Sequence, residues 1–306
     1  MHVALIGYGE VGRILAEDLR AADHAVTTFD VKLRSKAGVP IRAHALVHGV
    51  QLADSHAEAV RSAVLTVSAV TASQTVAAAQ ACAGALPDGG FFVDFNSASP
   101  GAKIAAADHI ARGGGRYVEG AVMTSVPPFR IKVPLLLGGP HAEAVLPTLR
   151  DLGFVAQVAS SQLGVASATK MCRSVMIKGL EAMVIESFTA ARHYGVEEAV
   201  IASLGETFPG VDWQQQAAYF FQRVIRHGRR RAEEMREAAV TVREAGLEPW
   251  SAAGSADRQA WAAELADAGI FGKQPSSKPH KLRGRSADWR VAADRILDHI
   301  KTEKEA

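Results

Sequence analysis

One lysine stands in a sequence setting where it could remove a proton from a substrate. Lys170 lies six residues after Gly164 in the stretch GVASATKMCRSVMIKG, whose small and unbranched residues predict a helix. On a helical wheel, the residues of its polar face are Lys170, Arg173, Ser174, Lys178 and Glu181. Such an amphipathic pattern is ordinarily a solvated face. From these residues alone, Lys170 is either a surface charge or a catalytic base.

A glycine loop near the N-terminus predicts a dinucleotide site. GYGEVG places Gly7, Gly9 and Gly12 directly after an apolar strand candidate, 2–7, and at the start of a helix. The first glycine permits a tight turn, the second lets the backbone approach a pyrophosphate, and the third lets the helix pack on the strand. The exposed N–H groups of the helix start would bind the pyrophosphate. The other loop residues expected at the cofactor are Tyr8, Glu10 and Val11.

An acidic residue ends the next strand candidate and indicates which dinucleotide binds. Asp30 lies about 20 residues beyond the glycines, where a carboxylate accepts hydrogen bonds from the adenosine ribose and repels a 2′-phosphate. Three cations follow at alternate positions, Lys32, Arg34 and Lys36. They form either a solvated loop or a site that neutralises that phosphate. The expected cofactor is NAD or NADP, with NAD favoured, and the expected contacts include Asp30, Val31 and Lys32.

Four blocks of the sequence resemble the β-hydroxyacid dehydrogenases, the group that contains 3-hydroxyisobutyrate and 6-phosphogluconate dehydrogenases. The blocks are GYGEVG with Asp30, DFNSASP (94–100), VEGAVMTSVPPFRIKVPLLLGG (118–139) and GVASATK (164–170). The last is similar to the family's G-x-x-x-x-x-K signature. In the second half, RRAEEMREAAVTVREAGLEP is similar to a little-characterised subgroup of this family.

The resemblance implies that Lys170 is the general acid/base. An enzyme that oxidises an alcohol removes the hydroxyl proton as hydride leaves carbon, and a lysine can accept it only if its pKa lies well below the ordinary value of about 10.4. By resemblance, the strand ends near the cofactor are Ser68, Ala69, Val70 and Asn96. The expected substrate-binding residues are Asn96, Ser97, Met123, Thr124, Ser174 and Lys178.

Several of these residues keep a second interpretation. Asn96 also fits a cap at the end of a strand, and Lys178 also fits the solvated end of the polar stripe. The family's S-G-G segment is replaced by Met123, Thr124 and Ser125, and its asparagine four residues after the lysine by Ser174. Because both changes affect substrate contacts, the substrate of no family member is carried over.

The weaker signals lie mostly in the second half of the chain. The basic segment 223–237 forms either solvated i,i+4 pairs or a clamp in which His227 or Arg230 binds an anionic substrate. Cys172 is expected in the core. The eleven histidines are taken to lack a pair or cluster with metal-ligand spacing, so no metal is expected.

The pattern of elements predicts how these residues are positioned. Strand candidates at 24–30, 63–70 and 90–96 alternate with helices, and further strands are expected at 115–123, 132–140 and 154–159. This predicts an α/β fold, a doubly wound Rossmann sheet over residues 1–160, followed by an all-helical substrate and dimerisation domain over 161–306. A bridging helix is expected at about 163–193, and a basic loop at 272–286.

Composition limits the classes of protein that remain. The 306 residues carry a net charge of +2, which argues against binding nucleic acid through bulk charge. Two cysteines favour a reducing, cytoplasmic setting, and no apolar run reaches the roughly 18 residues of a membrane helix.

The sequence therefore predicts a cytoplasmic, homodimeric NAD(P)-dependent dehydrogenase acting on a small anionic hydroxy acid. The alternatives are an imine or ketone reductase of the same architecture and a non-catalytic dinucleotide sensor.

Overall fold

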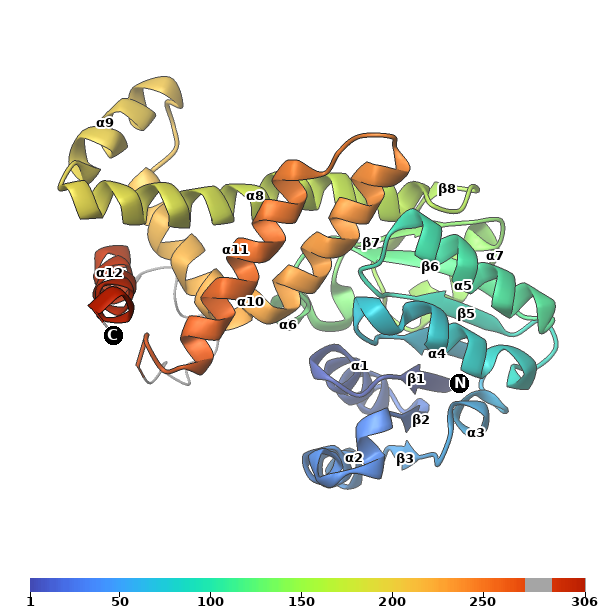
Figure 1. Cartoon of the computed structure of the whole chain (residues 1–306). Helices are drawn as coiled ribbons and strands as arrows, with labels where there is room; N and C mark the ends of the chain where they lie inside the picture. Colours follow the sequence, from blue (N-terminus) through green and yellow to red (C-terminus); the bar gives the residue numbers. More distant parts are fainter. Residues whose placement is uncertain (273–287, 306) are drawn as a thin grey trace. The chain divides into compact units, whose positions relative to one another are not determined.

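The computed structural model describes residues 1–272 and 288–305 (Figure 1). The chain divides within one helix into two compact units, Met1–Cys172 and Arg173–Ala306. From residue 273 on, the predicted basic loop 272–286 lies outside the described residues.

The first unit is built on an eight-stranded sheet, counted over the described residues, in the order β3-β2-β1-β4-β5-β6-β7-β8. Neighbouring strands are parallel except for β6 and β7, which pair antiparallel. The predicted doubly wound sheet is confirmed, with this one reversal. The strands are β1 (His2–Ile6), β2 (Ala25–Phe29), β3 (Gln51–Leu52), β4 (Leu65–Ser68), β5 (Phe91–Asp94), β6 (Arg116–Val122), β7 (Leu135–Gly138) and β8 (Ala156–Ser160).

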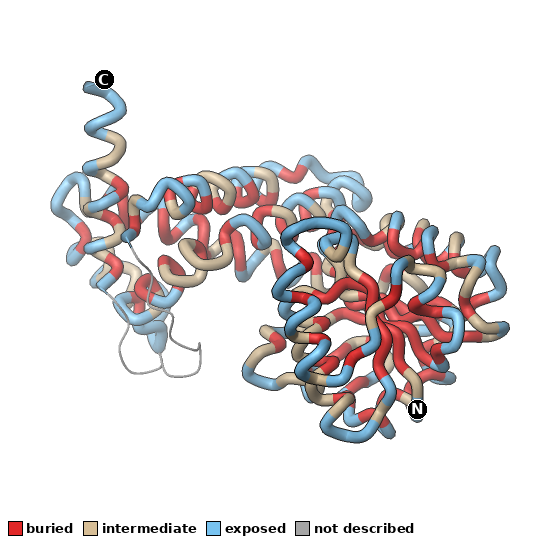
Figure 2. The backbone as a smooth tube through the Cα atoms, turned by 90° about the horizontal axis from the view of Figure 1, so that it is seen from below, coloured by how far each residue is buried: buried red, intermediate tan, exposed pale blue. Residues whose placement is uncertain are grey.

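Helices cover both faces of this sheet because its strands are apolar on both sides. One apolar cluster joins the sheet to α1, α2 and α7, and a second joins its other face to α3, α4 and α5. In Figure 2 the buried residues follow the strands near the N-terminus. The helices of this unit are α1 (Glu10–Ala21), α2 (Val39–His48), α3 (His56–Val60), α4 (Thr75–Cys82), α5 (Pro100–Arg112), α6 (Val126–Phe129) and α7 (Ala142–Asp151).

The second unit is helical, as expected, over its described residues. Its core gathers aromatic side chains from several helices, including Phe188, Phe221 and Trp289. Gly228 of α10 lets α11 approach closely, because a Cβ there would lie 2.6 Å from the Gln259 carbonyl oxygen. The helices are α8 (Val165–Tyr194), which begins in the first unit, α9 (Glu197–Thr207), α10 (Trp213–Glu244), α11 (Trp250–Asp267) and α12 (Trp289–Glu305).

In the second unit, α8 buries three residues of its polar stripe, although Arg173 of the same stripe is exposed. Ser174, Lys178 and Glu181 of the polar face are buried, whereas Met176 is 73% exposed. Cys172, in the first unit, is exposed too, so its expected place in the core is wrong. Lys178 and Glu181 are buried because α10 supplies partners for their charges.

Candidate functional site

The glycine loop has the geometry that its three glycines predict. Gly7 has φ +92°, and its N–H donates to the Phe29 carbonyl oxygen at 2.9 Å. A Cβ at Gly12 would lie 2.2 Å from the Gly7 oxygen, so that position packs helix on loop. A Cβ at Gly9, by contrast, would meet nothing within 4 Å. The loop is therefore closed against the protein at Gly7 and Gly12 and open where a ligand would approach.

This opening suits the pyrophosphate of a dinucleotide. Gly9 is the N-cap of α1 and has no side chain to accept from the first-turn N–H groups. Those groups, at the positive end of the helix macrodipole, are the donors that bind phosphate in such folds. The remaining predicted loop residues lie at the same turn: Tyr8, which is buried, Glu10, which is exposed, and Val11, which is half-buried.

The acid after β2 is held in place by backbone donors. One carboxylate oxygen of Asp30 accepts from the Tyr8 N–H at 2.8 Å and the other from the Lys32 N–H at 2.9 Å. Each oxygen keeps lone pairs for a further donor. Val31 and Lys32 are exposed beside it. The acid is thus fixed next to the glycine loop, where a ribose hydroxyl could bind it.

Asn96 uses its side chain to join two strand ends. Its Oδ1 accepts from the Val70 N–H at 2.7 Å, and its Nδ2 donates to the Ser68 hydroxyl at 3.0 Å. Asn96 is only 3% exposed. This is the strand-end cap of the second interpretation, and it fixes the segment 68–70, including Ala69, beside the glycine loop.

A buried charged network that the sequence reasoning missed lies beneath Asn96. Asp94 accepts from the Asn96 N–H, from the Tyr117 hydroxyl at 2.7 Å and from the Lys103 ammonium at 3.0 Å. Burial and the Asp94 charge raise the pKa of Tyr117 well above its usual range, so its hydroxyl remains a donor. The signal in the sequence was Lys103 on the otherwise apolar buried face of α5.

Lys170 reaches the second predicted block. Its ammonium Nζ donates to the Ser97 hydroxyl at 2.6 Å, across 73 residues of sequence. Ser97 follows β5, and Lys170 is half-buried near the start of α8. The glycine loop, Asp30, residues 68–70 and Ser97 all follow parallel strands, so they share the carboxyl edge of the sheet, where ligands of such folds bind.

A buried carboxylate holds the start of the helix that carries Lys170. Glu119, 1% exposed on β6, accepts from the Ala166 N–H and the Ser167 hydroxyl, both at 2.9 Å. A negative charge at a helix N-terminus satisfies orphan N–H groups and complements the macrodipole. Glu119 thereby fixes the position from which Lys170 extends. The sequence showed it only as an acid inside an apolar strand.

The chain just beyond the segment that replaces the family's S-G-G is tied to α1 through Arg130. Met123 is half-buried and Thr124 exposed, directly after β6. Further along, Arg130 adopts φ +54° and donates to Glu17 and Asp18, both at 2.7 Å. The two ion pairs hold a conformation that a non-glycine residue rarely adopts.

In the second unit, the remaining predicted residues meet around a carboxylate. Lys178 pairs with one oxygen of Glu234 at 2.9 Å and donates to the Ser174 hydroxyl at 3.0 Å, while Arg230 pairs with the other Glu234 oxygen at 2.9 Å. Burial lowers the pKa of Lys178 against the opposing effect of Glu234. Lys178 is 7% exposed, so the solvated interpretation is wrong.

Arginines dominate the rest of this unit's charged cluster. Arg231 pairs with the buried carboxylate of Glu181. Burial, reinforced by the nearby charges of Arg230 and Arg223, lowers the pKa of His227 to about 4. His227 is therefore neutral at physiological pH, and an anion clamp here would rely on the arginines.

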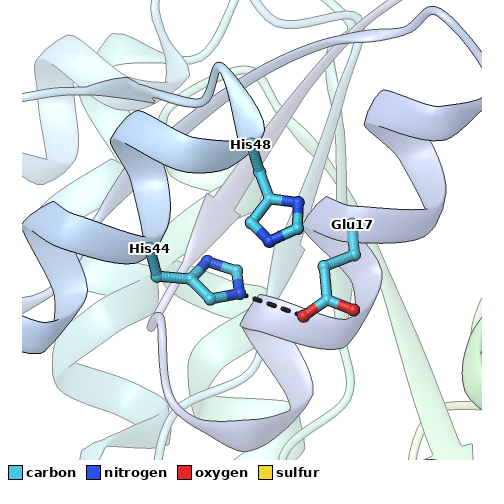
Figure 3. A group of neighbouring side chains, drawn as sticks. All are labelled: Glu17, His44 and His48. Carbon is cyan, nitrogen blue, oxygen red and sulfur yellow. Dashed lines mark hydrogen bonds and ion pairs between the residues drawn. The ribbon is translucent and has the colours of Figure 1, made fainter.

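The expectation about metal ligands needs a correction. His44 and His48 are spaced four residues apart on α2, and Glu17 of α1 faces them (Figure 3). The three groups each offer one ligand atom, and these atoms all lie within 4.8 Å of one another. The spacing H-x-x-x-H was visible in the sequence and was overlooked.

Two family profiles match the chain. The NAD-binding domain of 6-phosphogluconate dehydrogenase matches residues 2–152, and a domain of unknown function (DUF1932) matches residues 191–262. Over the described residues, no helix is long and apolar enough to cross a bilayer.

Solved structures place the whole chain among similar proteins. A conserved hypothetical protein from Sinorhizobium meliloti 1021 is 36% identical, with 96% of each chain covered and a TM-score of 0.72. A conserved protein of unknown function, described as structurally similar to 3-hydroxyacid dehydrogenases, is 29% identical over 87% of this chain and 99% of that chain, with a TM-score of 0.67. Mycobacterium tuberculosis 3-hydroxyisobutyrate dehydrogenase with L-serine is 16% identical over 96% and 98%, with a TM-score of 0.66.

Proposed function

We propose that this chain, which belongs to the β-hydroxyacid dehydrogenase family and to a little-characterised subgroup of it, oxidises a small β-hydroxy acid with Lys170 as the general base. Membership assigns it to the NAD(P)-dependent oxidoreductases. The substrate class and the role of each residue are our proposal. The observation that carries it is the 2.6 Å contact between Lys170 and Ser97 at the sheet edge that also bears the glycine loop.

Different residues of the first unit would bind different parts of the dinucleotide. The first-turn N–H groups of α1 would hold the pyrophosphate, with the open position at Gly9 leaving room for it. Asp30 would accept from the adenosine ribose, which favours NAD over NADP. A bound nicotinamide supplies the hydride acceptor for oxidation and the hydride donor for the reverse reaction.

We assign the transfer of the substrate's hydroxyl proton to Lys170. As hydride leaves the substrate carbon, the neutral amine takes the hydroxyl proton, and in reduction the ammonium returns it to the carbonyl oxygen. The Ser97 hydroxyl orients the Nζ, and Glu119 fixes the helix that carries it. A lysine at this position favours a hydroxy acid over an imine as substrate. We further propose a cytoplasmic homodimer that binds no nucleic acid.

The test is a fluorescence titration with NADH and NADPH, followed by a hydroxy-acid screen. Gly9→Val is the decisive variant, because a Cβ at this position would meet no protein atom within 4 Å and would extend into the space left for the ligand. We expect tighter binding of NADH by the wild type, a loss of binding in Gly9→Val, and an unchanged thermal midpoint. The screen includes 3-hydroxyisobutyrate and L-serine, the compounds named for the mycobacterial protein. Failure of both dinucleotides to bind at about millimolar concentration would overturn the proposal.

A further inference from the structure

A cluster of three metal-ligating side chains lies on α1 and α2, and the proposed reaction uses none of them. His44 and His48 lie one turn apart on α2, and Glu17 projects from α1, which packs against α2. Figure 3 shows the two rings and the carboxylate converging. We propose that Glu17, His44 and His48 bind one zinc ion, with the fourth position of the tetrahedron left to water.

The spacing of the three groups suits a tetrahedral site. With metal–ligand distances of about 2.0–2.1 Å, neighbouring ligand atoms of such a site lie about 3.4 Å apart. The Nε2 of His44 and the Oε1 of Glu17 are already 3.0 Å apart, and all three ligand atoms lie within 4.8 Å of one another. Small side-chain rotations bring them to bonding distance. Two imidazoles and one carboxylate are a ligand set that zinc prefers.

The Tyr8 hydroxyl is placed to support coordination of zinc through the Nε2 of His44. The other ring nitrogen of His44, Nδ1, lies 3.1 Å from the Tyr8 hydroxyl. Coordination through Nε2 needs the ring proton on Nδ1, and a hydroxyl can then accept it in the hydrogen bond. Tyr8 is thus the outer-shell partner that metal-bound histidines usually have.

The carboxylate and the helix end favour a cation as well. The Oε1 of Glu17 faces the Nε2 of His44 at 3.0 Å. Arg130 holds the other Glu17 oxygen and is itself paired with Asp18, which offsets its charge. His48 is the last residue of α2, at the end of a helix that attracts positive charge.

The test uses the full chain, without a histidine tag and stripped of metal with a chelator. Isothermal titration with ZnCl2 is expected to show one tight site per chain, and Co2+ is expected to give the intense visible absorption of a tetrahedral ion. His48→Ala is the first variant, because its ring stacks on His44 at 4.4 Å and its removal leaves the Glu17–Arg130 pair intact. It should weaken zinc binding by more than about 100-fold. Loss of a ligand costs more than loss of a residue that only hydrogen-bonds a ligand, which costs about 10–100-fold.

Two further variants keep the result interpretable. Tyr8→Phe retains the ligands and should weaken zinc binding by about 10–100-fold. His109→Ala removes an imidazole from α5 and should bind zinc as the wild type does. Thermal midpoints without metal show that each variant folds. Equal binding by His48→Ala and the wild type, or no binding by the wild type at about millimolar zinc, would overturn the proposal and leave the cluster as a stacked hydrogen-bonded contact.

Discussion

Two lysines of α8, Lys170 and Lys178, lie eight residues apart and share one polar stripe in the sequence, yet the structure gives them different surroundings. Lys170 is half-buried and donates to a neutral hydroxyl. Lys178 is buried and paired with a carboxylate, which also binds an arginine. A lysine that exchanges a proton with substrate has to pass through its neutral form, whereas one that holds a buried carboxylate has to stay charged. Our proposal assigns proton transfer to Lys170 and a structural role to Lys178, although burial lowers the pKa of Lys178 as well.

The largest expected effect separates the two lysines by activity. Lys170→Met should lower kcat by about 10²–10⁴-fold, the usual contribution of a positioned acid/base, and leave NADH affinity and thermal stability near wild type. Steady-state kinetics on a hydroxy acid from the screen and a fluorescence titration measure both. A kcat within about twofold of wild type would remove Lys170 from the chemistry.

The reciprocal variant separates them by stability. Lys178→Met leaves Glu234 buried with only part of its pairing and should cost about 3 kcal/mol of unfolding free energy, the lower end for a broken buried pair. Urea denaturation measures this. The double variant Lys178→Met/Glu234→Leu should recover most of the loss, because the carboxylate that had lost its partner is then absent. An undiminished stability of the single variant would contradict the structural role.

Glu119 offers an intermediate case, since it acts on Lys170 through the helix start. Glu119→Gln weakens the acceptance of the Ala166 N–H and the Ser167 hydroxyl and should cost about 1–2 kcal/mol. It should also lower kcat about tenfold through misplacement of Lys170, with NADH affinity unchanged. Ser167→Ala, which removes one donor, is the milder control. A stability loss without any change in kcat would show that Glu119 supports the fold alone.

The smallest expected effect is a pH dependence of stability that arises from His227, which lies among the arginines of the second unit. The pKa of His227 is lowered to about 4 from an ordinary 6.5, so protonation favours the unfolded state. Stability should fall as pH drops from about 6.5 to about 4, by about 1 kcal/mol because His227 is partly exposed. Thermal midpoints across this range measure it. His227→Gln should lose less stability over the same interval, and parallel curves would refute the assignment.

The sequence predicted some parts of the fold and of the candidate site and not others. Residues 2–22 run in the order strand, glycine loop, helix, and Asp30 ends the next strand. These features predict the Rossmann unit because the apolar pattern, the glycine positions and the acidic residue all agree. Residue spacing on α8 predicted the polar stripe but not its burial, because partners such as Glu234 lie more than 50 residues away. Asp94, Lys103 and Glu119 went unnoticed as single charges inside apolar elements. The elements β3, α3 and α2 were not predicted. The first two are short and α2 is only weakly amphipathic, so none shows a clear repeat of apolar residues.

Chemical rescue is the most direct test of whether Lys170 exchanges a proton with the substrate. Lys170→Ala and Lys178→Ala are assayed for dinucleotide reduction by a hydroxy acid, with increasing concentrations of methylamine. We expect Lys170→Ala to be nearly inactive and to regain turnover in proportion to the free amine, while Lys178→Ala does not respond. Turnover by Lys170→Ala at the wild-type rate without amine would contradict this role of Lys170.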